Sequence, residues 1–328
     1  MDDHEALIQI VHISDLHFQA ENESYQGACE RTSLRAWGDH FERIGWPKWA
    51  AWCKDARENI GSGEPEFIDE FERSLDKLMT PVWKDKTWLV QTGDLTAMGG
   101  HVSVREMNKR LGSICTSRNV RMFSMYGNHD AWPRAFPAMA ALARPFIVWR
   151  SLSTHDQLTW LRESGCFHDT YPVNPAFVTA KDERTHLLEL HLVDTITNHP
   201  ILNTFGFGLT GTFGDYARGR PGVQLKQLVK RLDEPSGGRC VSVIACHHPV
   251  HDNCPEVNRY QMRLLDAQVV ADSLAGTTHA REGHPTIVLC GHYHACHPLS
   301  VSSTGCRRFL AMRPWRSAPD RGRLRRTT

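Results

Sequence analysis

The feature that most constrains the fold of this chain is a series of apolar runs that end in Asp, Asn or His. The runs are rich in β-branched residues, which is typical of buried strands. In five of the six, the polar residues stand at the carboxyl end or just beyond it, where open α/β sheets place their functional sites. The six runs cover residues 7–13, 87–95, 120–130, 186–195, 240–249 and 285–294.

Helical patterns separate several of these runs. Apolar residues recur at helical spacing before the second run and before the fifth. The first set is Phe67, Phe71, Leu75 and Leu78, and the second lies within residues 223–232. Strands that alternate with helices predict an α/β fold in which helical layers cover both faces of the sheet.

One segment departs from this alternation. Residues 18–93 are far longer than a single crossover helix requires. We therefore predict a helical insertion over residues 18–86, which either buries its aromatic rings against the sheet edge or caps the substrate entrance. Its tryptophans are Trp37, Trp46, Trp49 and Trp52.

The length and net charge of the chain limit its number of domains and the partners that it can bind. We predict one domain over residues 1–312 and an Arg/Pro-rich tail over residues 313–328, which is typical of a solvated, disordered end. The formal net charge is +1, so the global balance indicates neither a nucleic-acid partner nor an anionic membrane surface. The sequence does not indicate an oligomeric state.

The first residues are acidic where a signal peptide needs basic ones, and no window approaches the ~20 apolar residues of a membrane span. The ten cysteines form neither a CxxC pair nor a regular framework, which favours reduced thiols. We therefore expect a cytoplasmic protein.

Five short motifs follow the predicted strands. Each is weak alone, because a lone histidine is more often a hydrogen-bonded core residue than a ligand. Their joint occurrence in this order indicates a metal site. The single residue within DxH or GHxH puts both flanking side chains on one face if the backbone is extended. The motifs are Asp15-x-His17, Gly93-Asp94, Gly127-Asn128-His129-Asp130, His247-His248 and Gly291-His292-x-His294.

The residue types in these motifs limit which metals can bind. Imidazole and carboxylate together favour Mn, Fe, Zn or Co over Mg and Ca, which prefer oxygen ligands. Two such ions ~3.5–4 Å apart need a bridging carboxylate, and they clamp the attacking and leaving oxygens of an in-line displacement. We expect two divalent transition-metal ions as cofactors.

The order DxH, GD, GNHD, HHP and GHxH resembles that of the calcineurin-like metallophosphoesterase superfamily, over residues 8–312 apart from the insertion. The resemblance implies a four-layer α/β/β/α sandwich with a helical insertion after the first motif, and a dinuclear metal site. These motifs are specific for the superfamily and poorly specific for the substrate.

The resemblance also implies the role of each ligand. Asp94 would bridge both metals, together with a hydroxide that attacks the phosphorus. In HHP the family's ligand stands two residues before the proline, which favours His247 over His248. The first metal would be bound by Asp15, His17 and His294, and the second by Asn128, His247 and His292.

Two further residues would act beside the ligands. His129 would donate a proton to the leaving oxygen, which is general-acid work. Asp130 would orient His129. His248 and His251 either line the substrate mouth and bind phosphate oxygens or only face solvent, whereas His297 is not expected to be a ligand.

Four cysteines near the motifs could suggest an additional zinc ion. Two of them fall in or at the end of apolar runs, so buried packing is the favoured interpretation. The four are Cys246, Cys254, Cys290 and Cys296.

Three segments resemble the cyclic-nucleotide phosphodiesterase branch: "LHLVDT" with Asp194-Thr195, "GVQLKQLVKRL" and "ACHHPV". The motif Gly93-Asp94-Leu95-Thr96 lacks the arginine that protein Ser/Thr phosphatases carry there. The first expectation is therefore hydrolysis of a phosphodiester in a small phosphorylated molecule, with a cyclic nucleotide as one candidate.

Three alternatives stay open at this point. A phosphomonoesterase would act on a small molecule or a phosphoprotein. A nuclease would need a phosphate-neutralising basic groove, which the near-neutral charge does not favour. A non-catalytic scaffold would have no need for intact ligands and a proton donor.

Overall fold

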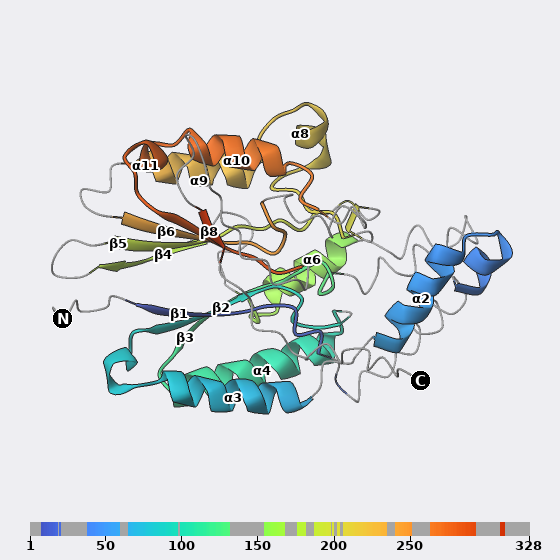
Figure 1. Ribbon diagram of the computed structural model, residues 1–328, viewed down its shortest axis with the longest axis horizontal. Coiled ribbons are helices and arrows are strands. Elements are labelled where there is room, and N and C mark those ends of the chain that lie inside the picture. Colours follow the sequence, from blue (N-terminus) through green and yellow to red (C-terminus); the bar gives the residue numbers. More distant parts are fainter. Residues whose placement is uncertain are drawn as a thin grey trace, which may run out of the picture.

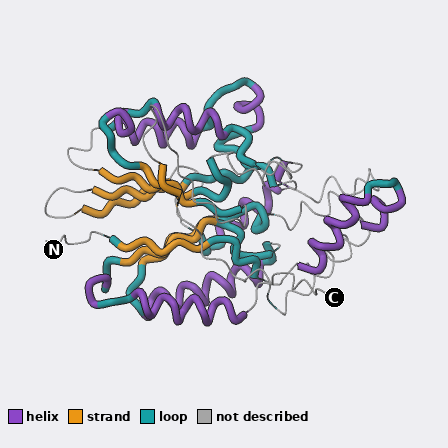
Figure 2. Tube along the Cα trace, viewed as in Figure 1, coloured by secondary structure: helices purple, strands orange, loops and turns teal. Residues whose placement is uncertain are grey.

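Two β-sheets lie face to face, and a layer of helices covers the outer face of each (Figure 1). The same order of layers is visible in Figure 2, so the predicted four-layer α/β/β/α sandwich is confirmed. The computed structural model describes residues 8–18, 20, 38–59, 65–97, 99–131, 154–167, 176–181, 187–197, 199, 202–203, 206–234, 240–250, 263–292 and 309–311.

The first sheet holds the first three motif-bearing strands in the order β1-β2-β3, all parallel. These are β1 (Gln9–Ile13), β2 (Thr87–Thr92) and β3 (Arg121–Met125). Two helices, α3 (Pro65–Leu78) and α4 (His101–Ser117), cover its outer face (Figure 1). Because all three strands run the same way, the loops that carry DxH, GD and GNHD leave the sheet at one edge.

The second sheet has the order β4-β5-β6-β7-β8, in which only the pairing of β4 with β5 is antiparallel. Its parallel strands β5, β6 and β7 carry Asp194-Thr195, HHP and GHxH at their carboxyl ends. The strands are β4 (Ala176–Lys181), β5 (Leu187–Leu192), β6 (Cys240–Ala245), β7 (Thr286–Leu289) and β8 (Phe309–Ala311).

Three helices cover the outer face of the second sheet: α9 (Val223–Asp233), α10 (Ala267–Ala275) and α11 (Thr278–Arg281). Two others, α6 (Thr154–Glu163) and α8 (Phe213–Ala217), lie beyond the sheets in Figure 1. A short 3-10 helix, η1 (Pro81–Trp83), precedes β2.

The six predicted strands are confirmed, and the Asp, Asn or His residue that follows each strand lies two or three positions beyond its end. β4 and β8 were not predicted. β4 begins the second sheet as its antiparallel strand, and β8 has only three residues, too few for a readable pattern. The predicted helix over 223–232 is α9, whose residues Leu225, Leu228 and Leu232 are buried.

Helix α3 lies within residues 18–86, which we assigned to the insertion, but its apolar face belongs to the main core. Phe67, Phe71 and Leu75 are buried in one cluster with residues of the first sheet and α4, whereas Leu78 is 44% exposed. Full burial of such side chains contributes about 1.5–3 kcal/mol each. This helix is therefore part of the outer layer of the sandwich.

Helix α2 (Pro47–Asn59) carries the Trp-rich part of the insertion and lies apart from the two sheets (Figure 1). Trp46 and Trp49 are 54% and 44% exposed, so these two rings are not buried against a sheet edge, which was one of our two interpretations. They pack on Phe41 instead, at ring-centroid distances of 5.9 and 6.0 Å. Trp37 and the side chain of Trp52 lie outside the described residues, and the role as a cap stays a prediction.

In the described part of the chain, no helix has both the length and the apolar character needed to cross a membrane.

Candidate metal centre

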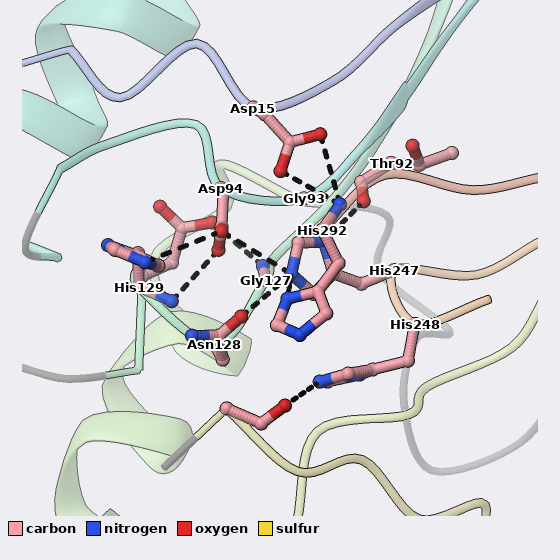
Figure 3. Close-up of polar contacts among 12 residues, drawn as sticks. Asp15, Thr92, Gly93, Asp94, Gly127, Asn128, His129, His247, His248 and His292 are labelled. Carbon is pink, nitrogen blue, oxygen red and sulfur yellow. Dashed lines mark hydrogen bonds and ion pairs between the residues drawn. The ribbon is translucent and has the colours of Figure 1, made fainter. Parts of the chain in front are cut away.

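The motif residues meet where the carboxyl ends of the two sheets face each other (Figure 3). Asp15 follows β1, Asp94 follows β2 and Asn128 follows β3, while His247 and His292 follow β6 and β7. Segments far apart in the sequence thus place carboxylate, amide and imidazole groups around one point.

The backbone of the motifs is not extended. Asp15, His17, Asp94 and His292 all have positive φ, at 56°, 48°, 51° and 75°. The extended backbone on which we based the prediction for DxH is therefore not found, and His292 is not extended either. Hydrogen bonds hold the DxH backbone in this conformation. Asp15 N–H donates to Gly93 O and His17 N–H donates to Asp94 O, both at 3.1 Å. Non-glycine residues in this region are strained, and such strain is concentrated at functional sites.

The glycine of GNHD allows the loop after β3 to approach the loop after β2. A Cβ atom on Gly127 would lie 2.2 Å from Asp94 Oδ1 and 2.8 Å from His247 Cε1. Any side chain there would displace the carboxylate at the centre of the cluster.

Asp94 lies at that centre and is fully buried. Its Oδ1 accepts the backbone N–H of His129 at 2.8 Å. Its Oδ2 has no well-formed hydrogen bond among the described residues, and instead faces three imidazoles. The Nε2 atoms of His247, His17 and His129 lie 3.4, 3.9 and 3.9 Å away. Burial alone would raise the pKa of Asp94, but these histidines hold it well below its usual range.

His247 is fixed so that one nitrogen faces the cluster. Its Nδ1 donates to Thr92 O at 2.9 Å, which leaves Nε2 2.8 Å from Asn128 Oδ1 and 3.2 Å from His292 Nδ1. Burial opposes protonation of His247, but the charge of Asp94 outweighs it and raises the pKa to about 9. Asp94 therefore stabilises a positive charge on His247.

These donors fit divalent cations. Two nitrogen ligands that each lie ~2.1 Å from one metal ion are about 3.0–3.4 Å apart, as are the facing nitrogens of His247 and His292 at 3.2 Å. Asp94 belongs both to a group with His17 and His129 and to a group with Asp15 and His247, each with ligand atoms within 4.8 Å of one another. This shared position is what a bridging carboxylate requires.

The structure therefore brings together six of the predicted ligands. Asp15 lies beside His292, because both of its carboxylate oxygens accept the backbone N–H of His292, at 2.9 and 3.1 Å. The six are Asp15, His17, Asp94, Asn128, His247 and His292. The predicted ligand His294, with His251, His297, Cys254 and Cys296, lies outside the described residues.

The remaining two cysteines near the motifs pack in an apolar cluster with α9 and α10. Cys246 is buried, and burial raises the pKa of the Cys290 thiol to about 12. Protonated thiols are poor metal ligands. The contacts agree with the packing interpretation.

His129 is oriented by a group that we did not predict. Its Nδ1 donates to Ala97 O at 2.8 Å, so the bond expected from Asp130 is made by a backbone carbonyl. Nε2 is left on the side of Asp94, and the side chain is 23% exposed. An imidazole that is held at one nitrogen and accessible at the other is suited to transfer a proton.

Asp130 joins two motif loops instead. Its carboxylate accepts the N–H groups of Leu95, Thr96 and Gly127 at 3.1, 2.9 and 2.8 Å, and the Thr96 hydroxyl at 2.8 Å. Burial and the nearby charge of Asp94 raise the pKa of Asp130 to about 6. Its contacts hold the GD loop against the GNHD loop.

Asp130→Ala is expected to lower the free energy of unfolding of the metal-free protein by about 3 kcal/mol. Three buried N–H groups would lose their acceptor, and each such loss costs about 1–3 kcal/mol. Urea titration measures the effect. Asp76→Ala is the control, because Asp76 is an exposed carboxylate that accepts a bond from Arg118 at 2.7 Å. Equal losses in the two variants would contradict the loop-joining role.

His248 neither lines a substrate mouth nor faces solvent, so both of our interpretations of this residue are wrong. The side chain is fully buried and both ring nitrogens make hydrogen bonds, to Thr195 Oγ1 at 2.9 Å and to Gly206 O at 3.0 Å. Burial, with His292 and His247 nearby, lowers the pKa of His248 well below its usual value. A neutral, enclosed ring is poorly placed to bind a substrate anion.

Sequence reasoning missed three groups that support the site. Two are the backbone carbonyls of Thr92 and Ala97, for which no residue type is a signal. The third is Gln157 on α6, whose side-chain amide donates to Asp130 O at 3.0 Å and to Gly99 O at 3.1 Å. Its isolated position in the sequence gave no sign of this role.

Two facing sheets, with this cluster where their carboxyl ends meet, are the fold and site of a metal-dependent phosphoesterase. A family model for calcineurin-like phosphoesterases matches residues 8–296, and the chain belongs to that family. Among solved structures it is similar to a dimetal phosphatase from Danio rerio, at 13% identity and a TM-score of 0.42, over 94% of this chain and 88% of that one. No curated protein matches the chain significantly.

Proposed function

We propose that this protein is a dinuclear metal-dependent phosphodiesterase that acts on a small phosphorylated molecule, with cyclic nucleotides as one candidate class. The observation that carries the proposal is the position of Asp94, whose Oδ2 lies 3.9 Å from His17 Nε2 and 3.4 Å from His247 Nε2. A carboxylate between two sets of ligands suits a pair of cations, and phosphoester hydrolysis is the activity that the family indicates.

Divalent transition-metal ions, when bound, would neutralise phosphate oxygens and lower the pKa of a water molecule that serves as nucleophile. Asp94, which lies next to both His17 and His247, would help to hold these ions. The full set of holders would be Asp15, His17, Asp94, Asn128, His247 and His292, with His294 as the seventh from the sequence alone.

His129 would supply the proton for the leaving oxygen. Ala97 O holds Nδ1, and Nε2 lies 3.9 Å from Asp94 Oδ2, beside the centre of the cluster. The rings of His17 and His129 pack edge to face at a centroid distance of 4.5 Å. This contact limits rotation of the His129 ring. A proton donor fixed in this way lowers the barrier for a poor leaving group.

Charge supports a diester over a monoester. Among the described residues, the positive partners that lower the pKa of Asp94 are histidines. A phosphate diester carries one negative charge, whereas a monoester carries up to two and gains more from a fixed cation. The Asp194-Thr195 pair after β5 and the absence of an arginine beside Asp94 point the same way.

A substrate panel tests the proposal. With Mn loaded, we expect kcat/KM for bis-p-nitrophenyl phosphate or cyclic AMP to exceed that for p-nitrophenyl phosphate by about tenfold or more, a difference of ~1.4 kcal/mol in the barrier. Chelator-treated protein without added metal is the control and should be inactive on all three. Preference for the monoester would overturn the diester assignment.

We also infer a cytoplasmic location. The cysteines that the structure describes are free thiols, and free thiols are typical of proteins kept in a reducing compartment. Fractionation of cells that express the tagged chain would test this, and recovery from an extracellular or oxidising fraction would contradict it.

A further inference from the structure

His248 follows the predicted ligand His247, and hydrogen bonds fix its ring (Figure 3). Gly206 O can only accept, so His248 Nε2 carries the proton in that 3.0 Å bond. Nδ1 is then the acceptor for the Thr195 hydroxyl at 2.9 Å. Thr195 Oγ1 in turn accepts the backbone N–H of His248 at 3.1 Å. Because both nitrogens are used in this way, the ring has no lone pair directed at a metal ion.

The fixed ring packs against two predicted ligands. Its centroid lies 4.4 Å from that of His292 and 5.0 Å from that of His247, which it meets edge-on at 82°. The His247 and His292 rings are themselves 5.0 Å apart. The three imidazoles therefore form one packed group, in which a movement of His248 would displace both of the others.

Main chain also packs closely against the His248 ring. A Cβ atom on Gly208 would lie 2.5 Å from both Cγ and Nδ1 of His248, so only glycine allows this approach. Gly208 N–H donates to Arg263 O at 3.0 Å, and Gly208 O accepts the N–H of Leu265 at 2.9 Å. This segment is therefore held in place and restricts movement of the His248 ring.

We propose that His248, held by Thr195, is a positioning residue that orients His247 and His292 for the second metal, and that it is neither a ligand nor a contact for the substrate. The inference rests on the proposed dinuclear function. Groups that hold metal ligands in place commonly contribute about 10–100-fold to metal affinity. Removing the Thr195 hydroxyl is therefore expected to weaken metal binding by about 10–100-fold.

The test compares Thr195→Val, which removes the hydroxyl at nearly constant shape, with Thr195→Ser, which keeps it. Metal-free proteins are titrated with Mn²⁺, and the number and affinity of bound ions are measured by calorimetry. We expect two ions in the wild type. In Thr195→Val one of them should bind about 10–100-fold more weakly while the other is unchanged, and Thr195→Ser should restore it. kcat should fall with KM unchanged.

His248→Ala should weaken the same ion at least as much. His279→Ala is the matched control, because His279 is also buried and contacts a backbone oxygen, Pro285 O at 3.2 Å, but lies outside the cluster. If His248→Ala fails to fold, the Thr195 pair still decides the matter.

The outcomes separate the two proposals. Fewer than two ions in the wild type would contradict the dinuclear function itself. Two ions of unchanged affinity in both Thr195→Val and His248→Ala would overturn the positioning role. A raised KM with unchanged metal binding would make His248 a contact for the substrate and would also overturn it.

Discussion

Replacing Asp94 with asparagine is expected to lower kcat/KM by about 10³-fold or more and to reduce the number of bound metal ions. Asparagine has the same shape, and its oxygen can still accept the His129 N–H that Asp94 Oδ1 accepts at 2.8 Å. Its amide nitrogen cannot bind a cation. Metal ions contribute several kcal/mol to charge stabilisation, and ~4 kcal/mol corresponds to about 10³-fold. Elemental analysis and steady-state kinetics on the same preparation measure both effects.

Glu189→Gln is the matched control for this prediction. Glu189 is also a buried carboxylate, but it pairs with Arg231 and His191 away from the cluster. Its loss should leave the metal content and kcat/KM unchanged. Two tightly bound ions in Asp94→Asn would show that Asp94 does not bridge them. An equal loss of metal in Glu189→Gln would show that any buried carboxylate has this effect.

The apolar runs predicted an α/β fold because each motif-bearing strand is a short apolar run that stops close to its functional residues, whereas the four-layer sandwich was implied by the resemblance of the motifs. The end of β2 at Thr92 and the start of the polar loop at Gly93-Asp94 are an example. Such a boundary is a local property of the chain. The parallel arrangement then makes the ends of neighbouring strands in one sheet meet, as for Asp94 after β2 and Asn128 after β3. The encounter of Asp94 with His247 also requires the two sheets to face each other, because β2 and β6 belong to different sheets.

The supporting contacts could not be predicted in the same way. Asp130 was expected to hold His129, but its carboxylate accepts from Leu95, Thr96 and Gly127, and Ala97 O holds His129. Whether a side chain or a backbone oxygen fills such a place depends on the path of two loops. Those loops turn through the positive φ of Asp94, and residue type alone does not dictate that conformation.

His248 shows a further limit of sequence reasoning. The resemblance favoured its neighbour His247 as the ligand, but the sequence did not show what His248 itself contacts. The structure separates them because the His247 Nε2 faces Asp94 while the His248 Nε2 faces Gly206 O. Adjacent residues at the end of a strand can point in different directions, and the surrounding groups then give each ring a different chemistry.

Removing the side chain of His129 is expected to lower kcat by about 10²–10⁴-fold for a substrate with a poor leaving group, such as an alkyl phosphodiester. For a p-nitrophenyl ester the loss should be much smaller, because that leaving group needs little protonation. His129→Ala keeps the backbone N–H that donates to Asp94 Oδ1, so the carboxylate should keep its place. The measurement is the ratio of kcat for the two leaving groups in each enzyme.

Metal content distinguishes proton donation by His129 from a role as a ligand. Its Nε2 lies near His17 and Asp94 in a group that could hold a metal ion, so His129→Ala is also submitted to elemental analysis. Two ions per chain, with the leaving-group effect above, are the expected result. Loss of an ion, or equal loss of rate for both leaving groups, would contradict proton donation. His284→Ala is the control, because His284 contacts Glu282 at 3.1 Å outside the cluster and should leave both the ratio and the metal content unchanged.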